Sequence, residues 1–288
     1  MGMITGIGVL DASPPPVPRI RLWDCGVTWR DLNPAKGVYV WDRLDAMAAS
    51  GKCLLVLGTT PQWAAKHPDS STAASWLGPG SNSPPRLLTD WDAYVRHVVA
   101  RYGASIDYQI WNEPQSQPFW DPWKDIRRLA VMTRRAHAII KRAAPRARVV
   151  SAPVLPRPSS GGLRRGSVYL NALKAEGWPV DVFSFHAYPE EGATPSRYTW
   201  MVREVKAALR GLGAPTKPLW CTEVNYNLKC GPIPEQTVPA FLRSTTARSE
   251  TAGVSRVYWY AYPGHSDPNL LGIPFTPTSV GTSVLRSL

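Results

Sequence analysis

Eight short apolar runs, most of them separated by helix-like segments, constrain the fold of this chain more than any other feature. The runs cover residues 3–9, 19–23, 52–57, 106–111, 147–152, 180–185, 218–222 and 256–260. Most lack the polar–apolar alternation of a half-exposed strand, so both faces of each strand should be covered. Helices between parallel strands provide such cover. The sequence therefore predicts an α/β fold, with eight parallel strands forming a (β/α)8 TIM barrel.

The segments between the runs show the features of amphipathic helices. Residues 42–49 begin with Asp42 as the expected N-cap and end before Gly51. In residues 89–102, an apolar stripe that includes Trp91 and Tyr94 leads to Gly103. The remaining helices are expected over residues 126–144, 167–176, 198–212, 239–251 and 277–288.

The first connection departs from this alternation. Residues 11–18 include Pro14, Pro15, Pro16 and Pro18, which are incompatible with a helix. We therefore expect the barrel to lack a regular first outer helix, either as a trimmed barrel or with a partner or another domain over the exposed groove. A chain of 288 residues suits one such barrel, which typically takes about 250 residues. Residues 1–288 are thus expected to form a single domain.

Composition and charge exclude several classes of protein. No apolar stretch approaches the roughly 20 residues of a membrane helix, so membrane insertion is not expected. The net charge of +12 comes mostly from arginine, in pairs such as Arg127-Arg128 and Arg134-Arg135. On the predicted helices these pairs fall on outer faces, where a solvated surface is the first interpretation and attraction to an anionic polymer is the alternative. No nucleic-acid-binding motif is present, so nucleic acid is not an expected partner.

The location of the protein stays open at this level. The first eleven residues read as a strand without a basic n-region, so a signal peptide is not evident. An extracellular or phage-associated location is compatible with the sequence, as is attachment to a larger assembly. The cysteines, Cys25, Cys53, Cys221 and Cys230, lack metal-ligand spacing and are interpreted as buried thiols, with a Cys221–Cys230 disulfide as the alternative.

Two of the apolar runs end abruptly in a carboxylate. Glu113 follows the run over residues 106–111, and Glu223 follows the run over residues 218–222. Barrel active sites lie at the carboxyl ends of strands, and paired carboxylates are the catalytic groups of glycoside hydrolysis. The histidines show no His-x-x-x-His spacing, and the chain has no nucleophile elbow, P-loop or dinucleotide fingerprint. Neither a metal nor another cofactor is expected.

The segment Asn112-Glu113-Pro114 and the later Thr222-Glu223 resemble the retaining glycoside hydrolases of clan A. Four more segments are similar to the early strands of glycoside hydrolase family 39, which includes β-xylosidases, α-L-iduronidases and exopolysaccharide hydrolases: Arg21–Asp24, Gly26–Trp29, Lys36–Tyr39 and Leu55–Trp63. The resemblance covers nearly the whole chain. It implies that Glu113 is the acid/base at the end of the fourth strand and that Glu223 is the nucleophile at the end of the seventh.

The resemblance also implies a set of substrate-binding residues. Asn112 would bind the sugar hydroxyl beside the anomeric carbon, and Arg21 would approach the nucleophile. His186 and Tyr188 would orient the nucleophile or contact sugar, and Trp259 would form the floor of the catalytic subsite. Each residue has a structural alternative, such as an ion pair for Arg21 or core packing for Trp259. For four further tryptophans, the sequence favours a sugar subsite and core packing equally: Trp29, Trp63, Trp120 and Trp123.

Two long segments after strands, residues 64–86 and 115–123, should shape the substrate subsites. They favour an open cleft and endo action on a poly- or oligosaccharide, which could be anionic. A bacterial cell-wall or capsular polysaccharide is the expected substrate, whereas a β-xylosidase usually carries accessory β-domains. A transglycosylase would use the same residues. A non-catalytic carbohydrate-binding barrel is the alternative from another class.

Overall fold

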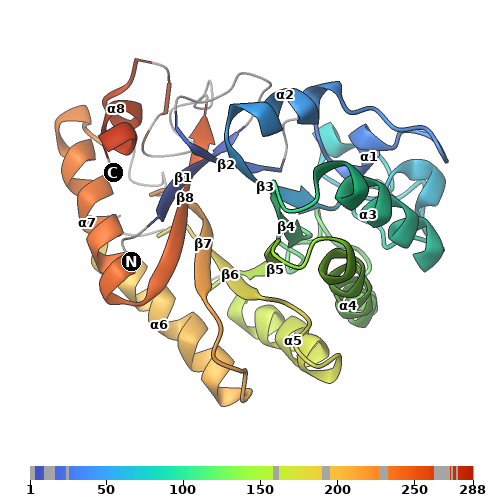
Figure 1. Ribbon diagram of the computed structural model, residues 1–288. Coiled ribbons are helices and arrows are strands. Elements are labelled where there is room, and N and C mark those ends of the chain that lie inside the picture. The colour runs from blue at the N-terminus through green and yellow to red at the C-terminus, as the bar shows by residue number, and fades with distance from the viewer. Residues whose placement is uncertain are drawn as a thin grey trace.

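A computed structural model describes residues 4–9, 17–23, 26–157, 162–189, 195–226, 233–262, 273, 275–276 and 278–287. Eight parallel strands close into a barrel in chain order (Figure 1). They are β1 (Ile4–Val9), β2 (Arg19–Leu22), β3 (Lys52–Leu57), β4 (Asp107–Ile110), β5 (Val149–Val154), β6 (Val182–Ala187), β7 (Leu219–Val224) and β8 (Val254–Tyr262). The predicted (β/α)8 barrel is confirmed.

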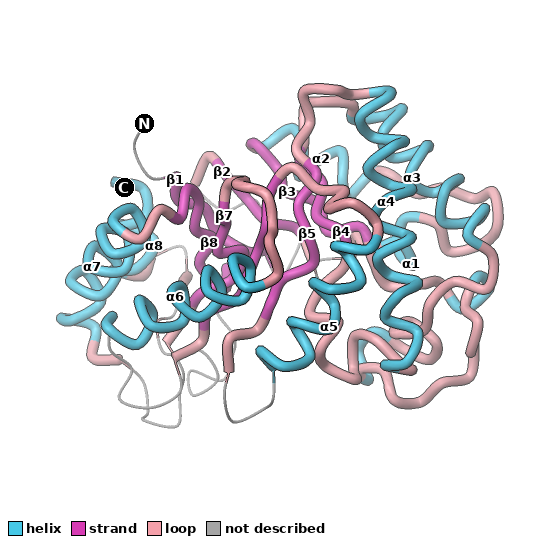
Figure 2. The backbone as a smooth tube through the Cα atoms, turned by 90° about the horizontal axis from the view of Figure 1, so that it is seen from below, coloured by secondary structure: helices cyan, strands magenta, loops and turns pink. Residues whose placement is uncertain are grey.

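Helices surround the barrel, and the tube in Figure 2 shows them flanking the strands. They are α1 (Trp29–Leu32), α2 (Asp42–Ser50), α3 (Leu88–Tyr102), α4 (Ile126–Ala143), α5 (Gly162–Ala175), α6 (Pro195–Gly211), α7 (Val238–Thr251) and α8 (Val280–Ser287). The short helix α1 was not predicted. The prediction that Asp42 is an N-cap is wrong by one residue, because Trp41 occupies that position and Asp42 begins the helix.

The connection between β1 and β2 is described only in part. Strand β1 ends at Val9 and β2 begins at Arg19, and residues 10–16 with Pro14, Pro15 and Pro16 lie outside the described residues. The expected absence of a first outer helix therefore stays a prediction. Cys25 and Cys230 also lie outside the described residues, so their interpretation as buried thiols stays a prediction. Cys53 and Cys221 are buried free thiols. The alternative of a Cys221–Cys230 disulfide falls on Cys230, which lies outside the described residues, and it stays a prediction.

The barrel interior is layered. Apolar side chains from five strands form a cluster separate from the main core: Leu54, Val150, Val182, Trp220 and Tyr258. At the amino ends of the strands Arg256 lies 3.8 Å above the ring of Trp220 and 3.1 Å from Asp107, which closes this end of the barrel. The main core lies between the strands and the surrounding helices. The polar groups described below sit inside the barrel beyond the apolar layer.

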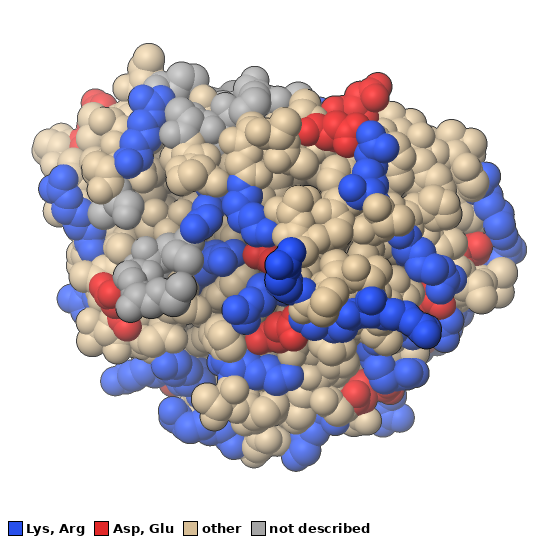
Figure 3. Space-filling model, in the orientation of Figure 1, with Lys and Arg blue, Asp and Glu red and all other residues tan. Residues whose placement is uncertain are grey.

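The surface of the molecule is rich in Lys and Arg, and Figure 3 shows them spread over the face viewed in Figure 1. The arginine pairs of α4 and α5 are exposed or half-buried, as the solvated-surface interpretation predicts. Many of these cations are engaged: Arg134 contacts Glu176 at 2.6 Å, and Lys141 contacts Asp181 at 3.0 Å. Within the described part of the chain, no helix combines the length and apolar character needed to cross a bilayer.

Candidate active site

A local irregularity in β7 brings Glu223 into the barrel. Phe185 of β6 pairs with Cys221, yet the next residue, His186, pairs with Glu223, so β7 carries one extra residue at this point. A bulge of this kind turns consecutive side chains toward the same side of a sheet. Both Thr222 and Glu223 accordingly make contacts inside the barrel, Thr222 with Gln109 and Glu223 with Arg21.

The end of β4 positions Glu113 through an unusual backbone. The strand ends at Ile110, and the backbone φ angles of Trp111 and Glu113 are +70° and +35°. Residues other than glycine rarely adopt a positive φ, and residues held in this conformation concentrate at functional sites. The segment is anchored by the Trp111 N–H, which donates to Leu57 O at 2.8 Å, and by the Ser116 N–H, which donates to Glu113 O at 2.9 Å.

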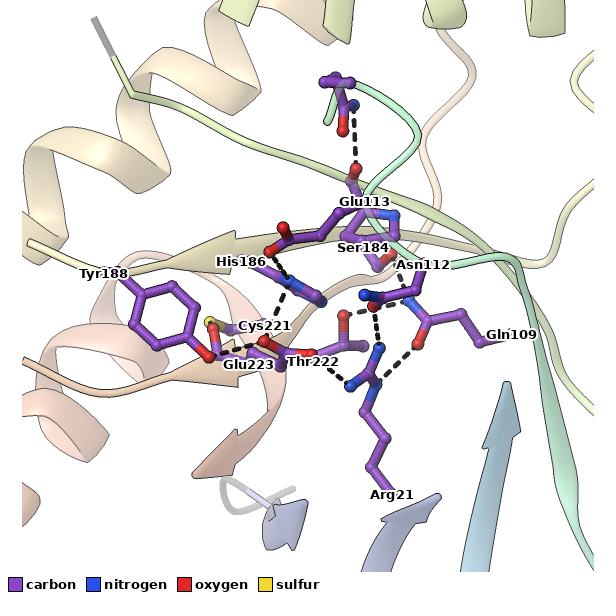
Figure 4. Close-up of polar contacts among 12 residues, drawn as sticks. Arg21, Gln109, Asn112, Glu113, Ser184, His186, Tyr188, Cys221, Thr222 and Glu223 are labelled. Carbon is purple, nitrogen blue, oxygen red and sulfur yellow. Dashed lines mark hydrogen bonds and ion pairs between the residues drawn. The ribbon is translucent and has the colours of Figure 1, made fainter. Parts of the chain in front are cut away.

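Arg21 holds together one half of the site (Figure 4). Its side chain is fully buried, and its guanidinium donates to Glu223 Oε1 at 2.6 Å and to Asn112 Oδ1 at 2.7 Å. A third bond runs to Gln109 Oε1 at 2.8 Å, and Gln109 Nε2 in turn donates to Ser184 Oγ and Thr222 Oγ1. A buried guanidinium requires such a set of acceptors, because an unpaired buried charge is strongly destabilising.

His186 joins the two carboxylates. Its Nδ1 lies 2.7 Å from Glu113 Oε1 and 3.3 Å from Glu223 Oε2. Tyr188, two residues further along, donates its hydroxyl to Glu223 Oε2 at 2.6 Å. Each oxygen of Glu223 therefore has its own donor, from Arg21 on one side and from Tyr188 on the other, while Glu113 shares the imidazole.

Burial shifts the pKa values of Glu113, His186 and Tyr188 away from their ordinary values. It raises the pKa of Glu113 above the ordinary value of 4.5, although the positive charges of Arg157 and Arg21 and a bond from Ser116 oppose the shift. Burial also lowers the pKa of His186 to about 3, so the imidazole is neutral near pH 7. The pKa of Tyr188 is raised well above 10.0 by burial and by the neighbouring Glu223, which keeps its hydroxyl a donor.

The structure brings together six of the predicted site residues: Arg21, Asn112, Glu113, His186, Tyr188 and Glu223. The predicted tryptophans are placed differently. Trp259 is fully buried and packs near Tyr226 and Phe275. A sugar would need access to a ring that the surrounding side chains cover, so its role as the floor of a subsite stays a prediction.

The other tryptophans lie in or against the core. Trp29 is fully buried, stacks on Tyr94 and contacts Trp91 edge-on, in the layer between α1 and α3. Trp120 is buried against Trp111, and Trp63 is half-buried with its indole N–H donating to Asn33 O at 2.9 Å. These contacts correspond to the packing alternative for Trp29, Trp63 and Trp120.

Sequence reasoning missed two polar residues of the site. Gln109 is a glutamine inside an apolar strand, and that contrast was the available signal. Arg157 follows β5, and its guanidinium lies 5.0 Å from the ring of Tyr188 and lowers the pKa of both Glu113 and His186. No spacing in the sequence links Arg157 to the carboxylates, because the closed barrel alone brings β5 beside β4 and β6.

A metal ion is the alternative occupant of this site. One ligand atom each from Glu113, His186 and Glu223 lie within 4.8 Å of one another, a spacing that could hold a cation. However, Nδ1 of His186 already contacts both carboxylates, and the guanidinium of Arg21 lies 2.6 Å from Glu223. Its positive charge would repel a cation at this position, so the residues fit a metal poorly.

No family model matches the sequence. Similar solved structures include a monomeric β-xylosidase from Caulobacter crescentus CB15, with a TM-score of 0.68 and 21% identity over 93% of this chain and 60% of that chain. An intracellular xylanase from Thermoanaerobacterium saccharolyticum has a TM-score of 0.66 and 14% identity, covering 99% and 95%. An exo-β-1,4-mannosidase from Opitutaceae bacterium strain TAV5 has a TM-score of 0.62 and 17% identity, covering 99% and 58%.

These similarities establish the fold. The chain is a (β/α)8 barrel like those of the glycoside-cleaving enzymes above, and it spans less than two thirds of the β-xylosidase and of the mannosidase. Membership of family 39 stays a prediction.

Proposed function

We propose that this chain is a single-domain retaining glycoside hydrolase in which Glu113 is the acid/base and Glu223 is the nucleophile. The observation that carries the proposal is the separation of the two carboxylates, which have oxygens within 4.8 Å of each other. Retaining enzymes keep these groups roughly 5 to 5.5 Å apart, whereas inverting enzymes separate them by about 6.5 to 9.5 Å to admit a water molecule. The short separation favours double displacement.

The reaction would proceed in two displacements. In the first, an oxygen of Glu223 bonds to the anomeric carbon while the bond to the leaving oxygen breaks, and Glu113 gives that oxygen its proton. In the second, Glu113 takes a proton from water, whose oxygen attacks the anomeric carbon and releases the Glu223 carboxylate. The Glu113 proton and the Glu223 carboxylate are both restored at the end of the cycle, and the sugar leaves with a hydroxyl group on its anomeric carbon.

The surroundings of each carboxylate support these roles. Glu113 has a raised pKa and is thereby suited to retain a proton until the leaving group needs it. Glu223 accepts bonds from Arg21 and Tyr188, which stabilise a negative charge on the attacking oxygens. In our proposal the neutral imidazole of His186 fixes the position of both groups.

Asn112 fits the role of a sugar-binding residue. Its Oδ1 accepts from Arg21 at 2.7 Å, which orients the amide and its Nδ2 group. That N–H group could donate to the hydroxyl beside the anomeric carbon, where a bond that strengthens in the transition state contributes to rate.

We propose a polysaccharide as the substrate, of the kind found in bacterial cell walls or capsules. The basic surface and the presence of Arg157 beside the site are compatible with an anionic glycan. The similar solved structures include enzymes described as acting on xylan, xylosides and mannosides, which supports a carbohydrate without selecting one.

The test is product release from purified polysaccharides, with wild type beside Glu223→Gln. The panel would contain arabinogalactan, galactan, xylan and acidic capsular glycans. Fragments released from one polymer by wild type only would support the proposal and identify the substrate. Binding to a polymer without any product from it would instead favour a carbohydrate-binding barrel without turnover.

A further inference from the structure

The two long loops after β3 and β4 are joined into one unit. Asn82 lies at the centre of the junction. Its side-chain Nδ2 donates to Gln117 O at 2.9 Å, and its backbone carbonyl accepts from the Asp121 N–H at 2.9 Å. Thr72 adds a bond from its hydroxyl to Asp121 Oδ2 at 2.6 Å. Because the bonds link residues of both loops, any surface that these loops present should have a defined shape.

This unit carries an aromatic cluster formed by Trp23, Trp76 and Phe119. The ring of Trp23 meets Trp76 edge-on at a centroid distance of 6.3 Å and Phe119 edge-on at 5.7 Å. Trp23 is buried, whereas 57% of Trp76 is exposed. The cluster therefore presents one large indole to solvent while its other members hold that indole in place.

The cluster adjoins the two carboxylates through β2. Trp23 follows Arg21 by two residues and comes directly after β2, which ends at Leu22. Arg21 contacts Glu223, and Trp23 packs with Val56 of β3 at the carboxyl end of the barrel. Trp76, beside Trp23, thus follows the same strand end that carries Arg21, the partner of the proposed nucleophile.

A cavity of about 250 Å³ lies against Trp76. It is lined by Gly26, Thr28, Arg30, Asp31, Trp76 and Leu77. A guanidinium nitrogen of Arg30 is buried and has no hydrogen-bond partner among the described residues. That nitrogen packs against Gly78 and is closed to a ligand, so the cavity is defined by the exposed indole of Trp76 and by the charged side chains of Arg30 and Asp31.

The chemistry of this cavity suits a sugar. An indole face is apolar and carries a partial negative charge, which complements the C–H face of a pyranose ring. Arg30 can donate to hydroxyl oxygens, and the carboxylate of Asp31 can accept from hydroxyl groups, although it also accepts from Thr28 in the cap of α1. A sugar ring combines an apolar C–H face with hydroxyl groups at its edge and therefore matches this lining.

We propose that Trp76 and this cavity form an outer sugar-binding subsite, so that the protein binds an extended glycan chain and cleaves it internally. This inference rests on the proposed glycoside hydrolase function. It assigns a specific role to Trp76 within residues 64–86, the loop that the sequence already placed at the substrate subsites.

Trp76→Ala is the test, with Val168→Ala as the matched control, since Val168 is an exposed apolar residue on α5. Rates would be measured on oligosaccharides of increasing length from the polymer that wild type cleaves, and on an aryl monoglycoside of the same sugar. We expect kcat/KM of Trp76→Ala to fall roughly 5- to 10-fold on the longest chains and to be unchanged on the monoglycoside. Equal effects at every length would overturn the subsite.

A binding measurement keeps this test separate from that of the catalytic proposal. Titration calorimetry of the Glu113→Gln protein with xylo-oligosaccharides and arabinogalactan fragments needs no turnover. Adding Trp76→Ala or Arg30→Ala should weaken binding of the longer fragments by a similar factor, and adding Val168→Ala should not. Unchanged affinity would reject the subsite even if wild type is an active hydrolase, whereas loss of affinity without turnover would reject only the hydrolase.

Discussion

At the scale of single residues, the two carboxylates share one imidazole and differ in their remaining partners. Glu223 is held by Arg21 and Tyr188, and Glu113 is held by a strained backbone and by His186. The two carboxyl groups lie close together inside the barrel, and Glu223 is paired there with a fully buried guanidinium. Such an arrangement costs stability and is typical of functional sites.

Glu113→Gln should reduce kcat/KM by on the order of 10² to 10⁴ for substrates with a poor leaving group, because the leaving oxygen then departs without a proton. The loss should shrink for aryl glycosides with an acidic phenol, which needs no proton to leave. Comparing the two substrate types by steady-state kinetics gives the result. An equal loss for both would argue against Glu113 as the acid.

Arg157→Gln should move the alkaline limb of the pH–rate profile to higher pH. The positive charge of Arg157 lowers the pKa of Glu113, so its removal lets that pKa rise further, and Glu113 then keeps its proton to a higher pH. The measurement is kcat/KM against pH for wild type and variant. Arg157→Lys retains the charge and should keep the limb near the wild-type position, and a shift to lower pH in Arg157→Gln would contradict the assignment.

At the scale of secondary structure, the sequence indicated every strand of the barrel because each is a compact apolar run. It also indicated both strand-end carboxylates, since a charge that ends such a run is conspicuous. The extra residue in β7 and the strained end of β4 were not predictable, because they depend on pairing with neighbouring strands. The same holds for the bond between Arg21 and Gln109, whose partners are distant in sequence.

The junction of α4, β5 and β6 offers a test of stability. Asp181 accepts from Val149 N–H at 2.9 Å and from Lys141 at 3.0 Å. Burial alone would raise the pKa of Asp181, but bonds from His137, Val149 and Lys141 outweigh it and lower the pKa below 3.8. A lowered folded-state pKa contributes stability above the ordinary pKa, and that contribution is lost as pH falls through the folded value.

Asp181→Asn should therefore lower the free energy of unfolding by about 1 to 2 kcal/mol at pH 7. The difference from wild type should narrow as the pH is lowered below 3.8. Urea denaturation at several pH values measures both effects. Asp69→Asn, at an exposed loop position, is the control and should match wild type throughout. A difference that grows in acid would contradict the linkage.

At the scale of the whole molecule, the net charge of +12 and the cations visible in Figure 3 should attract anionic polymers. Salt screens this attraction over a Debye length of about 10 Å at 0.1 M ionic strength. If the natural substrate is acidic, kcat/KM on that polymer should fall on the order of 10-fold as salt is raised from low to high concentration. A neutral polymer cleaved under the same conditions is the control, and an equal salt effect on both would show that surface charge does not select the substrate.

The most direct test of the central claim is the anomeric configuration of the first product, followed by ¹H NMR during cleavage of whichever glycoside the panel identifies. Two carboxylates within 4.8 Å predict double displacement, so the initial sugar should have the same configuration as the substrate before mutarotation. Initial release of the opposite anomer would mean that water attacks directly, and it would contradict the assignment of Glu223 as the nucleophile.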